Sequence, residues 1–401
     1  MASIFRICEE GYIEKIIFLS RMNKAEKIDY YISFAVFIQS FLIILQQVMI
    51  SILRMDAEAT TIYRVLGSAS FMSLAIFFSF MRKKKLFIFI YGITFLILLL
   101  NMSFFPENEE YLKKEAFRFL LPMVISSALC LMTVKSIEIV EKALYHVAWL
   151  SFGLVLIYAL FYLQGVFTID EYNMSFSYGC LLPMVSLYRY KSRLSVTASL
   201  FLFLIVLAIG SRGAAMVFVA YVLYDIAFVN IKYFLFLLMI AIGLFLSMDF
   251  FIEWLDSVGI HSRTLSLLIS DQAFQDSGRG YIYDKVYMAL GDKLWGLGLY
   301  GDRRILGGFY CHNIFLEMMV NWGYVGVFIL WPIIFVKLTI LYFNLNNVNK
   351  NRFVCYTLVL LGPLMFSNSY LLDPSFGIYC GLVYLISKTG IALNYFTVGN
   401  R

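Results

Sequence analysis

The sequence RKKKLFIFIYGITFLILLL, from Arg82 to Leu100, contains the pattern that decides the fold. A basic cluster is followed at once by a continuous apolar run. The hydrocarbon core of a membrane is about 30 Å thick, and a helix needs about 20 mainly apolar residues to cross it. Apolar residues make up 61% of the 401 residues and charged residues only 14%. This composition is typical of a chain that crosses a membrane repeatedly.

Apolar runs of this kind recur along the whole chain. They begin near Tyr30, Ile62, Leu86, Phe117, Ala143, Met174, Leu194, Ala214, Tyr233, Trp322, Phe353 and Phe376. Lipid leaves open backbone groups without partners, so we expect helices, and the lack of alternation excludes a β-barrel. The predicted fold is an all-α polytopic membrane protein, a single domain over residues 1–401 with about twelve transmembrane helices.

Basic residues in the short loops predict the orientation. They gather between successive runs at Arg82 to Lys85, Lys135 and Lys142, Arg189 to Arg193, and Lys350 and Arg352. By the positive-inside rule this side is cytoplasmic, and both termini are expected there. Residues 1–27 lack the apolar core of a signal peptide and are expected to form a cytoplasmic or interfacial segment. The net charge of +6 therefore reflects topology and not nucleic-acid binding.

The one long polar stretch falls on the opposite side. Residues 251–312 are expected to form a large outer loop that carries short helices and part of an active site. The part from Ser277 to Glu317 reads SGRGYIYDKVYMALGDKLWGLGLYGDRRILGGFYCHNIFLE. Helical spacing predicts a helix from Arg279 to Leu290, and a second helix is predicted from about Asn313. The glycines between them allow close approach to a ligand or to another backbone.

Two glycine-flanked arginines are candidate anion-binding residues. Arg212 lies in GSRGAA at a predicted helix start, and Arg279 lies in SGRG at another. Helix N-termini favour anions, and a guanidinium binds phosphate through two parallel hydrogen bonds. The alternatives are an Arg212 that extends to the headgroups and a solvated Arg279 in the loop. Arg303 and Arg304 are weaker candidates, because an exposed pair beside Asp302 is typical of a surface ion cluster.

His312 is the candidate general base. It is one of three histidines in the chain and precedes Asn313 in CHNIFLE, with Glu317 five residues further on. Imidazole accepts a proton near neutral pH. The alternative is an ordinary outer-surface histidine.

Several other classes of function lack their sequence signs. No C-x-x-C, H-E-x-x-H, P-loop, G-x-S-x-G or D-x-D pattern is present, so no metal site or cofactor is predicted. No internal repeat is visible. Charges come near the apolar runs at Asp225 and Lys337, both toward predicted cytoplasmic ends. These features argue against a transporter.

The motifs taken together resemble those of the O-antigen polymerase and O-antigen ligase superfamily of bacterial envelope glycosyltransferases. The matching elements are SRG from Ser211, GR from Gly278, WGLGLYG from Trp295 and HN-x-x-LE from His312. They cover about residues 210–326, whereas the resemblance in architecture covers the whole chain. Tyr283 stands where this family commonly has tryptophan after the loop arginine.

The resemblance implies a metal-independent glycosyltransferase of the bacterial inner membrane that uses polyprenyl-diphosphate-linked glycans as donor and acceptor. Arg212 and Arg279 would bind the diphosphate, and His312 would accept the proton of the acceptor hydroxyl. Tyr281 and Trp295 are candidates for stacking on sugar rings, with packing of the loop as the alternative. Arg303, Arg304, Asn313 and Glu317 complete the substrate-binding candidates. Membrane lipids, a chain-length regulator and a flippase are the expected partners.

Three functions remain open at this point. We favour a polymerase of O-antigen or capsular repeat units, because such chains are numerous and vary widely in sequence. A ligase that transfers the glycan to the lipid A core is the first alternative, and the motifs do not separate the two. A flippase of lipid-linked glycans is the second alternative, for which central charges and repeat symmetry would be expected.

Overall fold

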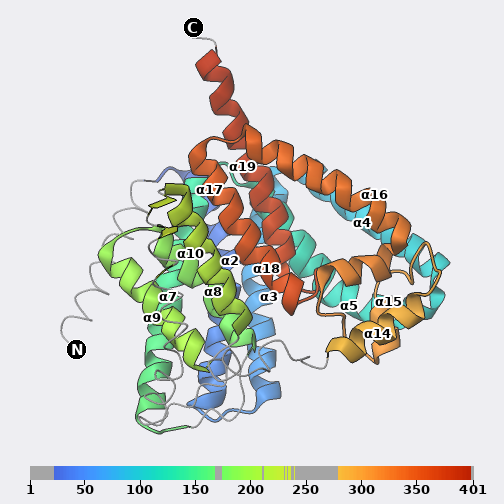
Figure 1. Ribbon diagram of the computed structural model, residues 1–401, viewed down its shortest axis with the longest axis horizontal. Helices are drawn as coiled ribbons and strands as arrows, with labels where there is room; N and C mark the ends of the chain where they lie inside the picture. Colours follow the sequence, from blue (N-terminus) through green and yellow to red (C-terminus); the bar gives the residue numbers. More distant parts are fainter. Residues whose placement is uncertain are drawn as a thin grey trace.

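The computed structural model describes residues 22–167, 174–209, 212–229 and 279–398, and positions 231, 232, 234, 235 and 239. Within these ranges the chain forms helices and connecting turns, and no strand (Figure 1). The predicted all-helical class is therefore confirmed. The predicted outer loop is described only from residue 279 onward. Residues 251–278, and most of the predicted N-terminal segment 1–27, lie outside the described residues.

The first part of the chain, from α2 to α7, contains long apolar helices joined by short helical segments. They are α2 (Lys24–Ser51), α3 (Ala57–Arg82), α4 (Lys84–Phe104), the short η1 (Pro106–Asn108), α5 (Glu109–Glu115), the π-helical η2 (Ala116–Ile125), α6 (Ser126–Thr133) and α7 (Ile137–Leu163). α2 begins at a capping box, in which Asn23 and Glu26 each accept from the other's backbone N–H (3.0 and 2.9 Å). Pro122 lies inside η2, where the loss of its N–H accords with the altered hydrogen bonding of a π-helix.

The second part contains mainly shorter helices and two long ones, α16 and α19. They are α8 (Met174–Arg189), α9 (Arg193–Ile209), α10 (Arg212–Val229), α14 (Arg279–Leu290), α15 (Gly301–Leu306), α16 (Ile314–Asn344), α17 (Asn347–Tyr356), the π-helical η4 (Thr357–Leu361), α18 (Gly362–Phe366) and α19 (Pro374–Val398). Every predicted apolar run except the one near Tyr233 begins on a described helix. The predicted helices at Arg279–Leu290 and from about Asn313 are also confirmed.

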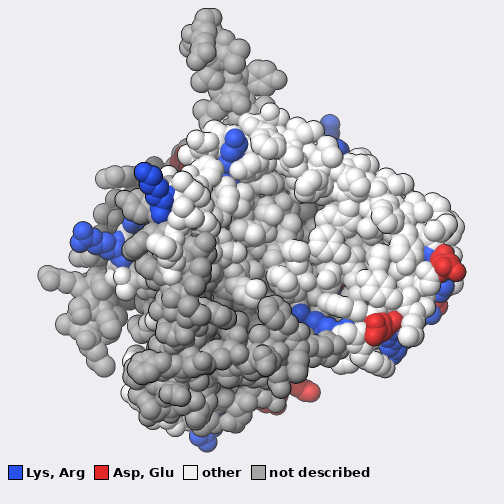
Figure 2. Space-filling model, viewed as in Figure 1, with Lys and Arg blue, Asp and Glu red and all other residues white. Residues whose placement is uncertain are grey.

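Among the described residues, six helical stretches are long and apolar enough to cross a membrane. They are Lys24–Ser51, Ala57–Arg82, Lys84–Phe104, Pro106–Thr133, Ile137–Leu163 and Ile314–Asn344. Figure 2 shows a broad face without charge, with most Lys, Arg, Asp and Glu side chains near its margins. Large apolar side chains are exposed on the surface of the bundle, for example Phe328 and Phe335 on α16. An exposed apolar belt of this extent fits a protein surrounded by lipid.

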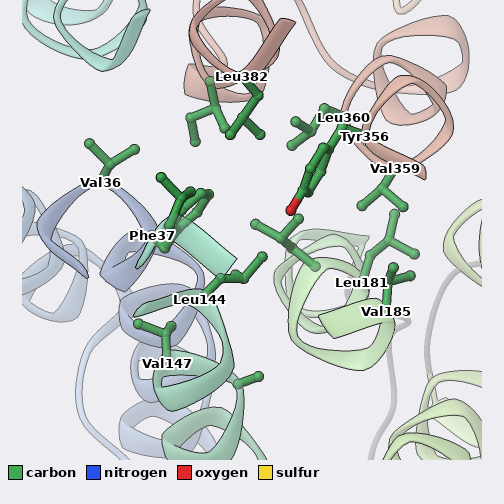
Figure 3. Packing of buried hydrophobic residues seen from close by; sticks show 14 of the residues in the cluster. Val36, Phe37, Leu144, Val147, Leu181, Val185, Tyr356, Val359, Leu360 and Leu382 are labelled. Atoms are coloured by element: carbon green, nitrogen blue, oxygen red, sulfur yellow. The ribbon is translucent and has the colours of Figure 1, made fainter. Parts of the chain in front are cut away.

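The main core is formed where α2, α7, α8, η4 and α19 meet. Figure 3 shows Phe37, Leu144, Leu181, Leu360 and Leu382 directed toward a common centre from these helices. All five side chains are buried. The core therefore joins the beginning of the chain to its last helix.

Glycines allow α19 to approach its neighbours closely. A Cβ at Gly377 would lie 1.9 Å from the carbonyl oxygen of Val124 in η2, and one at Gly381 would lie 2.9 Å from that of Ala128 in α6. Only glycine permits such backbone contact, which is common between membrane helices. This packing places the turn before α19 at a defined position beside η2.

Two of the basic loops predicted to be cytoplasmic are joined through Asp29 on α2. The Asp29 carboxylate pairs with Arg82 at the end of α3. It also accepts from the backbone N–H of Lys135 (3.0 Å). The end of α3 and the start of α7 therefore lie at the same end of the bundle.

The other two basic loops meet at Glu141 on α7. Its carboxylate accepts from Arg189 at the end of α8 (2.8 Å) and from Arg352 on α17 (2.7 Å). The four basic loops thus lie together, as their common charge predicts.

The polar segment after α14 packs against a break in α16. Gly323 has φ 71° and ψ −177° inside α16, and a Cβ there would lie 2.0 Å from the carbonyl oxygen of Leu294. The freed backbone bonds to the neighbouring loop, because Leu297 N–H donates to Val320 (2.7 Å) and Val325 N–H donates to Leu294 (3.2 Å). The glycine-rich loop was predicted to approach a ligand or a backbone closely, and here it approaches a backbone. Figure 1 shows α5, α14 and α15 grouped beside the bundle, near the N-terminal end of α16.

Candidate active site

His312 lies immediately before the N-cap of α16. The cap is Asn313, whose side-chain oxygen accepts from the backbone N–H of Phe315 (2.9 Å) and Leu316 (3.2 Å). His312 has a φ of 55°, in the left-handed region that is uncommon for residues other than glycine. Such a conformation costs of order 1–3 kcal/mol and persists where surrounding contacts hold it.

The hydrogen bond to Nδ1 fixes the tautomer of His312. Nδ1 lies 2.6 Å from the backbone carbonyl oxygen of Ser367, in the turn between α18 and α19. A carbonyl oxygen only accepts, so Nδ1 carries the hydrogen and Nε2 keeps its lone pair. In the part of the chain that the structure describes, Nε2 has no hydrogen-bond partner. The ring is therefore oriented with a proton acceptor available.

The surroundings of His312 favour the neutral imidazole. Burial lowers the pKa of His312 below its ordinary 6.5, the Ser367 carbonyl raises it, and the charges of Arg279 and Arg303 lower it. The charge of Arg279, another predicted catalytic residue, is thus one of those that act on the imidazole. The Tyr310 ring packs against the imidazole, and the two ring centroids are 4.3 Å apart. A neutral histidine beside a cation is suited to removing a proton near an anionic group.

Arg303 does not form the exposed pair with Arg304 that the sequence predicts. Its side chain is 1% exposed and bonds to Asp302 (2.6 Å) and Glu317 (2.6 Å), which are equally buried. Burial alone would lower the pKa of Arg303, but the two carboxylates raise it above its ordinary value. The prediction of an exposed pair is wrong for Arg303, because its partners come from α16 and from the residue beside it.

The buried network around Arg303 holds the two segments that meet at the hydrogen bond between His312 and Ser367. These are the residues just before α16 and the turn between α18 and α19. Asp302 accepts from the backbone N–H of Cys311 (3.2 Å), the residue before His312. Arg303 also donates to the Ser369 hydroxyl (2.6 Å), two residues after the Ser367 carbonyl that orients the imidazole. Arg303 is thus a positioning residue that fixes the distance between the two segments.

Glu317 has a structural role of the same kind. Its carboxylate bonds to Arg303 and the Ser369 hydroxyl, and accepts from the backbone N–H of Tyr370 (3.2 Å). Asn313 uses its side-chain oxygen as a helix cap. Both residues were predicted to bind substrate, and in this structure their side-chain oxygens already bond within the protein.

Arg304 fastens the segment to the corner after α4. Its Nε donates to Asn108 (3.1 Å), and its guanidinium lies 3.8 Å from Glu107. Asn108 in turn donates to the Leu297 carbonyl (2.6 Å), and Asn101 accepts from the Leu299 N–H (3.2 Å). No local sequence pattern indicates these asparagine contacts, because they join residues almost 200 positions apart.

The remaining predicted residues lie apart from this arrangement or outside what is described. Tyr281 on α14 is 71% exposed and Trp295 is 72% exposed. Arg212 begins α10, which packs against α18 just before the Ser367 turn. The Arg212 side chain lies outside the described residues.

A cavity of about 300 Å³ reaches Tyr310, whose ring packs against that of His312. Tyr310 lines it together with Asn368, Ser369 and Asp373 of the turn between α18 and α19. The other walls come from α2, α3, η2, α8, η4, α18 and α19. The sequence SNSYLLDP, from Ser367 to Pro374, places polar residues between two apolar runs. Sequence reasoning missed this signal.

The described residues form no metal centre, and no similar protein was found. Within the described ranges, no three His, Cys, Asp or Glu side chains are grouped so that they could hold a metal ion. Comparisons with protein-family models, curated proteins and solved structures gave no match.

Proposed function

We propose that this chain is a metal-independent glycosyltransferase that polymerises polyprenyl-diphosphate-linked oligosaccharide repeat units. The observation that carries the proposal is the pair formed by His312 and Arg279. The imidazole is oriented by Ser367, its Nε2 has no partner among the described residues, and the charge of Arg279, at the start of a helix, acts on it. Its neighbour Tyr310 lines a cavity. Transfer of a glycan from a diphosphate needs a base for the acceptor and a cation for the leaving group.

The reaction divides its tasks between these side chains. Nε2 of His312 takes the proton of the acceptor hydroxyl as its oxygen forms a bond to the anomeric carbon of the donor. The bond from that carbon to the diphosphate oxygen breaks, and the electron pair leaves with the polyprenyl diphosphate. Arg279, together with Arg212, stabilises the charge that grows on this leaving group. Arg303 keeps His312 in place and touches neither substrate.

The proposal includes the topology expected from the sequence. Its elements are about twelve spans, a large loop over residues 251–312 on the outer face, cytoplasmic termini and a bacterial inner membrane. The four basic loops that meet at one end support it. Cysteine labelling at Ser277 tests it. A probe there should react from outside the intact inner membrane, and reaction only after permeabilisation would contradict the orientation.

Transfer between purified lipid-linked repeats in detergent tests the reaction itself. The wild-type protein should form polymer with and without a chelator, and strict dependence on added divalent metal would contradict the metal-free mechanism. In cells, a deletion strain should retain a single attached repeat and lose the polymer. Loss of all attached glycan with accumulation of free polymer would instead identify a ligase.

A further inference from the structure

Arg64 places a positive charge inside the bundle, where the sequence reasoning did not notice one. It lies seven residues into α3 (Ala57–Arg82), which is about 10 Å along the helix at 1.5 Å per residue. The side chain is half-buried and lines the same cavity as Tyr310. An ionisable residue within an apolar helix is costly and is usually retained for a ligand or a partner.

No carboxylate neutralises Arg64 in the described part of the chain. It takes part in no ion pair or hydrogen bond there, and the charge that acts on it is that of another arginine, Arg118 of η2. Arg118 lies against the ring of Phe119 (5.1 Å to the centroid), which also lines the cavity. Asp373 lines the cavity too, but its oxygens accept from Asn368 and the Ser375 N–H. Two neighbouring arginines without a carboxylate favour an anion.

The cavity has the amphipathic lining that a lipid headgroup requires. Gln39, Ser40, Ser68 and Tyr178 supply polar groups near the arginine, and apolar residues such as Phe37 and Leu182 form much of the remaining wall. Tyr310 connects this cavity to the imidazole of His312. A group held by Arg64 would therefore lie in the same cavity as Tyr310, which packs against His312.

We propose that Arg64 binds the lipid-proximal phosphate of a polyprenyl-linked substrate, while Arg279 faces the sugar-proximal phosphate. This inference rests on the proposed function for the identity of the lipid. Arg64 on α3 would then be a third arginine of the substrate site, beside Arg212 and Arg279. Arg118 attracts the headgroup toward the cavity.

Binding of undecaprenyl monophosphate to the purified protein tests the inference, because this probe has only the lipid-proximal phosphate. A lost charge-assisted hydrogen bond corresponds to roughly 10- to 100-fold in affinity, so Arg64→Gln should weaken binding by this factor. Arg64→Lys should bind with intermediate strength. Arg279→Gln should leave monophosphate binding nearly unchanged and weaken undecaprenyl diphosphate binding. Arg54→Gln is the matched control on the exposed turn before α3.

Four outcomes would overturn the inference. They are unchanged monophosphate binding by Arg64→Gln with normal thermal unfolding, absence of binding by the wild type, equal competition by inorganic phosphate, and equal competition by phosphatidylglycerol vesicles. The last two would assign the site to free phosphate or to bulk lipid. Arg64-dependent binding of the monophosphate by a protein that fails the transfer assay would support the inference and contradict the proposed function.

Discussion

The two ends of the helical bundle use arginine differently. At the end that gathers the basic loops, Arg82 pairs with Asp29, and Arg189 and Arg352 share Glu141. Each of these ion pairs joins different helices. The arginines at this end therefore contribute to packing, and their charges are satisfied within the protein.

At the end that carries His312, three arginines lack such partners within the described ranges. No ion pair to Arg64, Arg118 or Arg279 exists among the residues that the structure describes. Arg303, at the same end, is paired twice. The comparison separates arginines that hold the fold from arginines that are available to an anion, and the sequence position alone does not make this distinction.

The largest expected effect is that of His312→Ala on transfer. A general base contributes about 10²- to 10⁴-fold, so turnover should fall by that factor while the protein still inserts and binds donor. His146→Ala is the control, because His146 accepts or donates a hydrogen bond with Tyr30 near the other end (2.8 Å). Turnover between purified lipid-linked repeats is the measurement. Near-normal turnover by His312→Ala would leave this residue only a structural role.

The next effect is on stability and concerns Arg303, an arginine whose charge is satisfied by ion pairs within the protein. Arg303→Met leaves Asp302 and Glu317 buried without their cation, which typically costs about 3–5 kcal/mol. Arg304→Met removes an arginine that is 36% exposed, and should cost about 1 kcal/mol or less. Thermal unfolding of both variants in the same detergent measures the difference. Equal melting temperatures would mean that the buried network does not stabilise the fold.

Arg303 and Arg304 also show where prediction from sequence ends. The bounds of α14 and the start of α16 could be predicted, because helical spacing and the Asn313 cap are local signals. The burial of Arg303 could not, because its partners Glu317 and Ser369 come from other elements. Sequence gives two adjacent arginines and no indication of which one faces inward.

The same limit applies to the candidate site. His312 and Arg279 were recognisable from residue type and from nearby glycines, and the charge of Arg279 acts on the pKa of His312. The group that orients His312 is the backbone carbonyl of Ser367, 55 positions away, which no side-chain pattern can reveal. Arg64 was detectable as a charge within an apolar run, and that signal was missed.

A smaller effect is expected for Arg279→Lys. The lysine keeps the charge but loses the planar fork that binds a phosphate through two hydrogen bonds. Loss of one charge-assisted hydrogen bond predicts a decrease in kcat/KM of roughly 10- to 100-fold. Arg54→Lys, an arginine exposed at the turn before α3, should remain fully active. Full polymer length and yield from Arg279→Ala would exclude the proposed role in binding the diphosphate.

The smallest effect, a shift in pH dependence, tests whether Arg279 and His312 act on one another. Burial lowers the pKa of His312 below 6.5, so the proton-accepting form persists, and the acidic decline in kcat/KM should lie below pH 6.5. Arg279 also lowers this pKa, because its charge disfavours the imidazolium. Arg279→Gln should therefore raise the pKa and move the decline to higher pH. NMR titration of the three histidines measures the same shift without turnover, with Arg54→Gln as the control. A His312 titration that is unchanged in Arg279→Gln, or shifted to lower pH, would mean that the two residues do not form one site.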